Sequence, residues 1–192
     1  MPNWIKRWFF DQMAAWCVLF RRRDLALEYY GRMLELDPGD PLALASIAFQ
    51  TAQLGRKQRA LAAFDRLLAV RPEDAEAHFN RGFLLQELND REGAMAAFRR
   101  AIALNPEHDR AHYGLALSLI SARRLEEALV PLQKNTKLQP MSPYGWYQLD
   151  RVQHELGRTD ETQQVLDHLA KFEPKIARQL ERETGLRAST LS

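Results

Sequence analysis

His108 and His112 lie four positions apart, a spacing at which one face of a helix can offer two imidazoles to a metal ion. His108 is expected in a turn, however, and no third ligand stands where it would complete a site. His112 instead has a counterpart in His78, which lies one period of the sequence pattern earlier. The two histidines are therefore expected to fill one repeated packing position, and the sequence predicts no metal site and no cofactor.

Other residues that could support catalysis lack the partners that they would need. Ser46, Ser118 and Ser121 have no base beside them. The acidic pair Glu126-Glu127 is expected at an exposed helix start, where negative charge suits the helix dipole. No strand pattern leads into a phosphate-binding glycine loop. We therefore predict that the chain is not an enzyme.

Composition narrows the possible partners and location. A net charge of +2 over 192 residues gives no general electrostatic case for nucleic acid. The start of the chain superficially resembles a secretion signal, but Asp11 interrupts its apolar run and no cleavage site follows. With a single cysteine, Cys17, expected to be buried, a cytoplasmic location is predicted. The preference for arginine over lysine indicates a bacterial source.

A strict period organises the chain. Prolines recur at a constant interval of thirty-four positions, as Pro38, Pro72, Pro106, Pro140 and Pro174. Alanines precede four of them by twelve residues, at Ala26, Ala60, Ala94 and Ala128. Such regularity predicts one supersecondary unit repeated along a solenoid. The predicted repeats are 7–40, 41–74, 75–108, 109–142 and 143–176, followed by a capping helix at 177–184 and a frayed tail at 185–192.

Each repeat contains two stretches with apolar residues at helical spacing and a short turn between them. Three turns carry residues that tolerate the left-handed conformation, namely Gly55, Asn89 and Gly157. Residues that commonly cap helices stand directly before three of the repeats, namely Asp40, Asp74 and Ser142. Each repeat is therefore predicted to be a helical hairpin.

This pattern resembles the tetratricopeptide repeat family over residues 7–176. The third repeat carries the family's residues as Gly82, Leu85, Ala94, Phe98, Ala101 and Pro106. The fifth carries Trp146, Leu149, Gly157 and Pro174. The resemblance implies an all-α, right-handed solenoid over residues 1–192, with the first helix of each repeat on the concave face. It also implies a scaffold or adaptor that binds other proteins.

Several residues depart from the pattern. Asp150 stands where the other repeats have Ala14, Ala48, Gly82 and Ala116. Asn135 and Thr136 put polar groups at positions that are apolar elsewhere, and Pro131 is expected to kink the second helix of the fourth repeat. The fourth and fifth repeats are therefore expected to pack less regularly.

Projected onto the family's geometry, the concave groove is a line of aromatic and aliphatic side chains with polar ones between them. Its predicted residues are Phe49, Phe79, Asn80, Phe83, Gln86, Tyr113, Leu117, Ile120, Tyr147, Gln148, Arg151 and His154. Such a groove suits an apolar or amphipathic peptide or helix. The alternative is that Phe79, Tyr113 and Tyr147 serve packing between repeats.

The N-terminal helix has more aromatic residues than one buried face requires. Phe10, Met13, Ala14, Cys17 and Phe20 are expected to form the inward stripe. The remaining aromatic residues, which form a possible docking surface, are Trp4, Trp8, Phe9 and Trp16. They pack internally, dock on a partner or a second copy, or place the chain on a membrane surface as a peripheral assembly factor.

Overall fold

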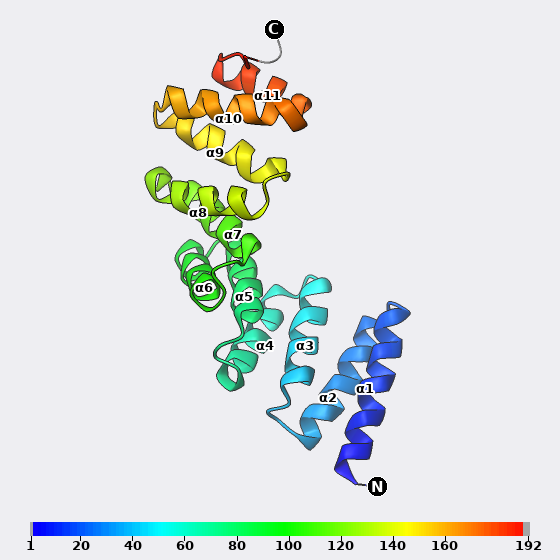
Figure 1. Ribbon diagram of the computed structural model, residues 1–192. Helices are drawn as coiled ribbons and strands as arrows, with labels where there is room; N and C mark the ends of the chain where they lie inside the picture. Colours follow the sequence, from blue (N-terminus) through cyan, green and yellow to red (C-terminus); the bar gives the residue numbers. More distant parts are fainter. Residues whose placement is uncertain (1, 190–192) are drawn as a thin grey trace. The chain divides into compact units, whose positions relative to one another are not determined.

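The computed structural model describes residues 2–189, and within that range it contains eleven α-helices and no strand (Figure 1). The all-α prediction is confirmed. The helices are α1 (Asn3–Leu19), α2 (Arg23–Leu36), α3 (Pro41–Gln53), α4 (Lys57–Val70), α5 (Ala75–Glu87), α6 (Arg91–Leu104), α7 (Asp109–Ser121), α8 (Leu125–Leu138), α9 (Pro143–Glu155), α10 (Thr159–Phe172) and α11 (Pro174–Thr184).

The chain forms two compact bodies that divide between Leu104 and Asn105. The N-terminal body holds α1–α6, and the C-terminal body holds α7–α11. Helices pair in sequence order within each body: α1 packs on α2, α3 on α4, α5 on α6, α7 on α8 and α9 on α10. The four pairs from α3 to α10 each lie within one predicted repeat, whereas α1 begins at Asn3, before the predicted start of the first repeat at residue 7. The odd-numbered helices from α1 to α9 are the first helices of the hairpins.

The turn inside every hairpin takes the left-handed conformation at the same repeat position. Gly55 (φ 71°), Asn89 (φ 63°) and Gly157 (φ 74°) adopt it, as predicted. Arg21 (φ 59°) and Arg123 (φ 60°) adopt it as well. Arginine gives no sequence signal for this conformation, so in those two turns the repeat geometry overrides the local preference.

The repeated proline carbonyl accepts a hydrogen bond from the helix that follows it. His78 Nε2 lies 3.0 Å from the carbonyl of Pro72, and His112 Nε2 lies 2.9 Å from that of Pro106. Trp146 Nε1 donates to the carbonyl of Pro140 at 3.0 Å. Because a carbonyl only accepts, the two histidines carry their proton on Nε2. This bond accounts for the recurrence of histidine at one repeat position.

His108 has a separate structural role, because its Nδ1 accepts from the amide of Ala111 at 3.3 Å and so caps α7. Within residues 2–189, no group of three or more His, Cys, Asp or Glu side chains is arranged to hold a metal ion.

Asp40 joins the first two repeats of the N-terminal body. Its carboxylate caps α3 by accepting from the amides of Leu42 (2.9 Å) and Ala43 (3.2 Å), and it pairs with the Arg7 guanidinium of α1. The side chain is almost fully buried. Burial acts to raise the pKa of Asp40, but the bonds from Arg7, Ala43 and Leu42 outweigh burial and lower it.

Replacing this cap should destabilise the N-terminal body. We expect Asp40→Ala to reduce the free energy of unfolding by about 1–2 kcal/mol, the usual effect of losing an N-cap. Because the folded-state pKa is lowered, the contribution of Asp40 is present above its unfolded pKa and is lost as pH falls through the folded value. Urea unfolding at pH 7 and at pH 3 should show a smaller difference between wild type and variant at pH 3. Equal differences at the two pH values would contradict this.

Small residues allow the helices to approach closely, as the repeated alanines predict. Ala14, Ala48 and Ala116 on the first helices have no exposed surface, and neither do Ala60 and Ala128 on the second. At Gly82, a Cβ atom would stand 2.9 Å from the ring of Phe98, so the glycine accommodates that ring.

The two polar residues of α8 that depart from the repeat pattern form hydrogen bonds within the fourth repeat. Asn135 Nδ2 donates to the carbonyl of Asp109 at 3.0 Å, and the Thr136 hydroxyl donates to that of Gln133 at 3.0 Å. Both side chains are buried. The helix continues on both sides of the buried Pro131. Asn135 therefore ties the second helix of the fourth repeat to the start of the first.

Asp150 also departs from the repeat pattern, but its side chain, unlike those of Asn135 and Thr136, has no hydrogen-bond partner among the described residues. It is fully buried on α9. Burial, reinforced by the charge of Glu183 on α11, raises the pKa of Asp150 to about 7. Asp150 therefore sits at a position that suits a small apolar side chain.

The C-terminal cap starts earlier than predicted, at Pro174, and ends at Gly185 in the left-handed conformation. The predicted frayed tail is corrected over residues 185–189. Ala188 is buried, and its amide donates to Glu181 at 2.8 Å. The Ser189 amide donates to Asp167 of α10 at 2.8 Å. The rest of that tail, 190–192, lies outside the described residues.

Candidate interaction site

Two phenylalanines on the first helices of the N-terminal body face solvent. Phe49 on α3 and Phe83 on α5 stand at the same repeat position, and each is 51% exposed. Leu42 is also exposed and lies seven residues before Phe49, hence on the same face of α3. We call Leu42, Phe49 and Phe83 the exposed apolar row.

The other predicted groove residues of the N-terminal body are less accessible to a partner. Phe79 is buried and packs on Phe98, with ring centroids 5.9 Å apart, so it serves packing, but within its own repeat and not between repeats as the alternative had it. Asn80 and Gln86 are half-buried, and the Asn80 amide donates to Glu76 at 3.4 Å. The row is therefore apolar with amides beside it.

In the C-terminal body, α7 presents the predicted residues Tyr113, Leu117 and Ile120, and all three are half-buried. Burial raises the pKa of Tyr113, while a hydrogen bond with Gln148 of α9 opposes that rise. These side chains are more enclosed than the exposed apolar row, and Tyr113 with Gln148 links the first helices of two repeats.

Two of the predicted residues on α9, Tyr147 and Arg151, contact the chain's own α11. The Tyr147 hydroxyl lies 3.1 Å from both carboxylate oxygens of Glu183, and Gln179 donates to that hydroxyl at 3.3 Å. The Arg151 guanidinium lies over the Tyr147 ring, 5.6 Å from its centroid. Here the C-terminal helix already occupies part of the predicted surface.

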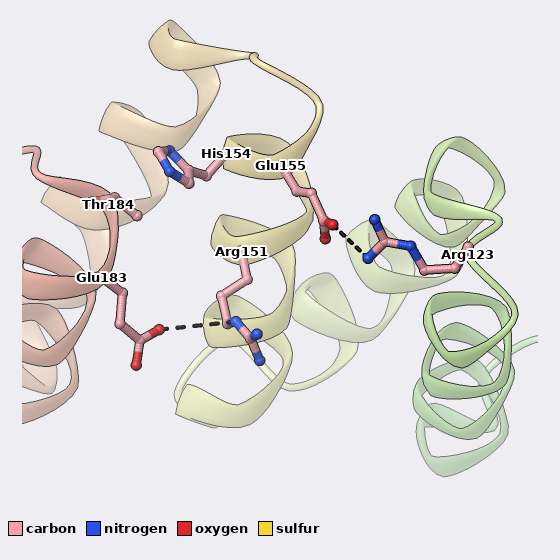
Figure 2. A pocket seen from close by; sticks show the side chains of 6 residues that line it. All are labelled: Arg123, Arg151, His154, Glu155, Glu183 and Thr184. Atoms are coloured by element: carbon pink, nitrogen blue, oxygen red, sulfur yellow. Dashed lines mark ion pairs between the residues drawn. The ribbon is translucent and has the colours of Figure 1, made fainter.

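An open pocket of about 590 Å³ lies beside this contact, and Figure 2 shows its side chains, which come from the turn after α7, from α9 and from the end of α11. Arg123 pairs with Glu155 at 2.5 Å, and Arg151 lies 3.9 Å from Glu183. The exposed His154 and the half-buried Thr184 complete the lining. Because each arginine faces a glutamate, the pocket offers no excess charge to an ionic ligand.

The outer side of α1 holds the largest group of exposed aromatic side chains among the described residues. Trp4, Trp8 and Trp16 are 72%, 60% and 57% exposed, and Phe9 is also exposed. The predicted inward position of Phe20 is wrong: it is 67% exposed and stacks on Trp16 with centroids 5.9 Å apart. Phe20 follows the last residue of α1, where the chain turns away from the core.

The repeat shows what is unusual about Phe9 and Trp16. At the position of Phe9, the later repeats have the buried residues Ala43, Ala77, Ala111 and Gly145. At the position of Trp16, they have the buried residues Gln50, Leu84, Ser118 and Val152. The first repeat thus exposes large aromatic rings at two positions that are covered in all the others. The inner side of α1 is filled as expected, with Ala14 and the free thiol of Cys17 buried against α2.

Paired antiparallel helices that recur with one constant period define an all-helical repeat protein of the solenoid class. A tetratricopeptide repeat family model matches residues 56–121, and the chain has the fold of tetratricopeptide repeat proteins, as predicted. No curated protein sequence matches the chain at a significant level.

Solved structures support the fold over nearly the whole chain. MamA from Desulfovibrio magneticus RS-1 is 24% identical, with a TM-score of 0.77 over 94% of this chain and 98% of that one. YrrB, described as a tetratricopeptide repeat protein with an unusual peptide-binding site, is 19% identical, with a TM-score of 0.78 over 90% of both chains. PilF from Pseudomonas aeruginosa is 19% identical, with a TM-score of 0.73 over 95% and 88%.

Proposed function

We propose that the chain is a non-enzymatic scaffold that binds a peptide or helix of a partner protein on the first helices of its repeats. The observation that carries this proposal is the exposed apolar row. Phe49 and Phe83 recur at one repeat position, where a folded monomer gains nothing from exposing a phenyl ring. Exposed aromatic side chains of this kind commonly supply most of the binding energy in protein interfaces.

The chemistry of the row indicates the kind of partner. Phenyl rings separated by one repeat, with the amides of Asn80 and Gln86 beside them, suit a segment with apolar side chains at intervals and polar groups between. The resemblance to YrrB, whose described site binds peptide, is in line with this proposal. A cytoplasmic location fits such a scaffold and stays a prediction.

Selection of peptides from a random library on the full chain would test the proposal. We expect the enriched peptides to be apolar or amphipathic, and the double variant Phe49→Ala, Phe83→Ala to bind them roughly tenfold or more weakly. The folded state should persist, because both rings are half exposed. The matched control is Val130→Ala, Met141→Ala, two exposed apolar residues of the C-terminal body that do not lie on a first helix. Equal affinity in wild type and the phenylalanine variant would contradict the proposal.

A second candidate function is favoured by a separate observation, the aromatic outer side of α1. We infer that this side is a docking surface formed by Trp4, Trp8, Phe9 and Trp16 together with Leu19 and Phe20. All six side chains are exposed, and a contiguous apolar surface of this kind marks a site of association.

A further inference from the structure

The outer side of α1 is apolar over an unusually wide arc. At about 100° per residue, the six exposed apolar side chains of the docking surface fall within about 160° of the helix circumference. Gln12 is the one polar side chain inside that arc. The opposite side packs on α2 through Ala14, Cys17 and Phe10. A helix with apolar residues on two opposite sides is normally covered on both of them.

The repeat itself shows what another helical hairpin could cover. A hairpin stacked before α1 would bury Phe9 and Trp16, whose equivalents are buried in the later repeats. It would leave Trp8 and Leu19, because the equivalents of both are exposed in all later repeats. A planar surface lying along the helix would contact the whole arc. The extent of the aromatic surface therefore favours a plane over a stacked hairpin.

The residue types and charges around the arc match a lipid surface. Three of the chain's four tryptophans lie in it, and tryptophan favours the headgroup level of a bilayer. Lys6, Arg21 and Arg22 are exposed at its edges, whereas Asp11 is the one acidic residue of α1. Arg7 is taken by Asp40. The edge of the surface thus carries the positive charge that anionic headgroups attract.

The other end of the chain differs in chemistry. The outer side of α11 carries Lys175, Arg178 and Arg182, a charged surface that needs no covering. A polar outer side is what a terminal helix of a repeat array normally has. An aromatic side on α1 is therefore not a general property of the end helices of this chain.

We propose that the outer side of α1 lies on an anionic lipid surface, with Trp4, Trp8 and Trp16 at headgroup depth and Lys6, Arg21 and Arg22 on the phosphates. This inference rests on the second candidate function and names its partner. The helix lies in the plane of the membrane, because no helix among the described residues is both long and apolar enough to cross one. Its 17 residues would extend about 25 Å along the surface.

Co-sedimentation of the full chain with vesicles tests the proposal. We expect binding to phosphatidylcholine vesicles that contain about one quarter phosphatidylglycerol. The variant Trp4→Ser, Trp8→Ser, Trp16→Ser should bind at least about tenfold more weakly. The variant Lys6→Gln, Arg21→Gln, Arg22→Gln should lose a similar factor on these vesicles and little on pure phosphatidylcholine. The matched control is Val130→Ser, Met141→Ser, Tyr144→Ser, three exposed apolar residues of the C-terminal body, and it should bind as wild type does.

Light scattering on the same proteins distinguishes a lipid surface from a second copy of the chain as the partner of the docking surface. The lipid proposal would be overturned if the wild-type chain bound neither vesicle but self-associated, and if the tryptophan variant were monomeric. That result would assign the surface to a second copy of the chain. A monomeric chain that binds neither vesicle would overturn the lipid proposal and assign the docking surface to a different protein.

Discussion

Asp150→Ala should raise the free energy of unfolding at pH 8 by up to about 4 kcal/mol relative to wild type. The reason is the burial of a carboxyl group that has no hydrogen-bond partner among the described residues. Burial raises the pKa of Asp150 from 3.8 to about 7. A shift of that size corresponds to about 4 kcal/mol between the protonated and charged forms, and alanine removes the penalty on the charged form.

The expected pH dependence follows from the direction of the shift. Between the unfolded pKa near 3.8 and the folded value near 7, the folded state binds more protons than the unfolded state. Wild-type stability should therefore fall as pH rises through this window, with the loss complete above pH 7. Urea unfolding at pH 5 and pH 8 measures it, and the gain from Asp150→Ala should be larger at pH 8. Asp160→Ala, at an exposed carboxylate on α10, is the control. A gain that does not change with pH would contradict this account.

Gly145→Ala should destabilise the C-terminal body by about 1–2 kcal/mol, because the added methyl group overpacks a buried contact. The equivalent residues in three other repeats are alanine, but a Cβ at Gly145 would stand 2.2 Å from Asn135 Oδ1. Asn135 is buried and held by its bond to the carbonyl of Asp109, so it cannot move away freely. The cost of overpacking therefore outweighs the helix propensity that alanine adds.

A second helical glycine provides the matched control. Gly31 in α2 has no atom within 4 Å of the point where a Cβ would stand, so Gly31→Ala should stabilise the chain by about 0.5–1 kcal/mol. The two substitutions are chemically identical and should have opposite signs in urea unfolding. Adding Asn135→Ala should relieve the clash and reduce the loss at position 145. A stabilising Gly145→Ala would show that Asn135 moves without penalty.

The sequence predicted the helical pairs because five copies of one pattern support each other. It also singled out Phe49 and Phe83 as large apolar side chains at a usually polar position, and the structure leaves both exposed. It could not identify the left-handed Arg21 and Arg123, whose residue type carries no signal for that conformation. The position of the tail was equally hidden, because Ser189 is held by Asp167, 22 residues away.

The predicted groove residues also show what the repeat pattern alone cannot predict. Tyr147 and Arg151 stand where the repeat places them, yet their neighbours are set by α11, which lies outside the repeated pattern. A period assigns a residue to a face of its own helix. It does not report whether a segment from elsewhere in the chain already lies on that face.

The bond from His78, His112 and Trp146 to the preceding proline carbonyl has a consequence for detecting such repeats. An indole and an imidazole differ in size and in aromatic character, but each brings one N–H to the same oxygen at 2.9–3.0 Å. In this chain the position is therefore filled by an N–H donor of suitable reach, and both ring types provide one. Searches keyed to tryptophan alone would overlook the third and fourth repeats of this chain, which are joined to their turns as firmly as the fifth.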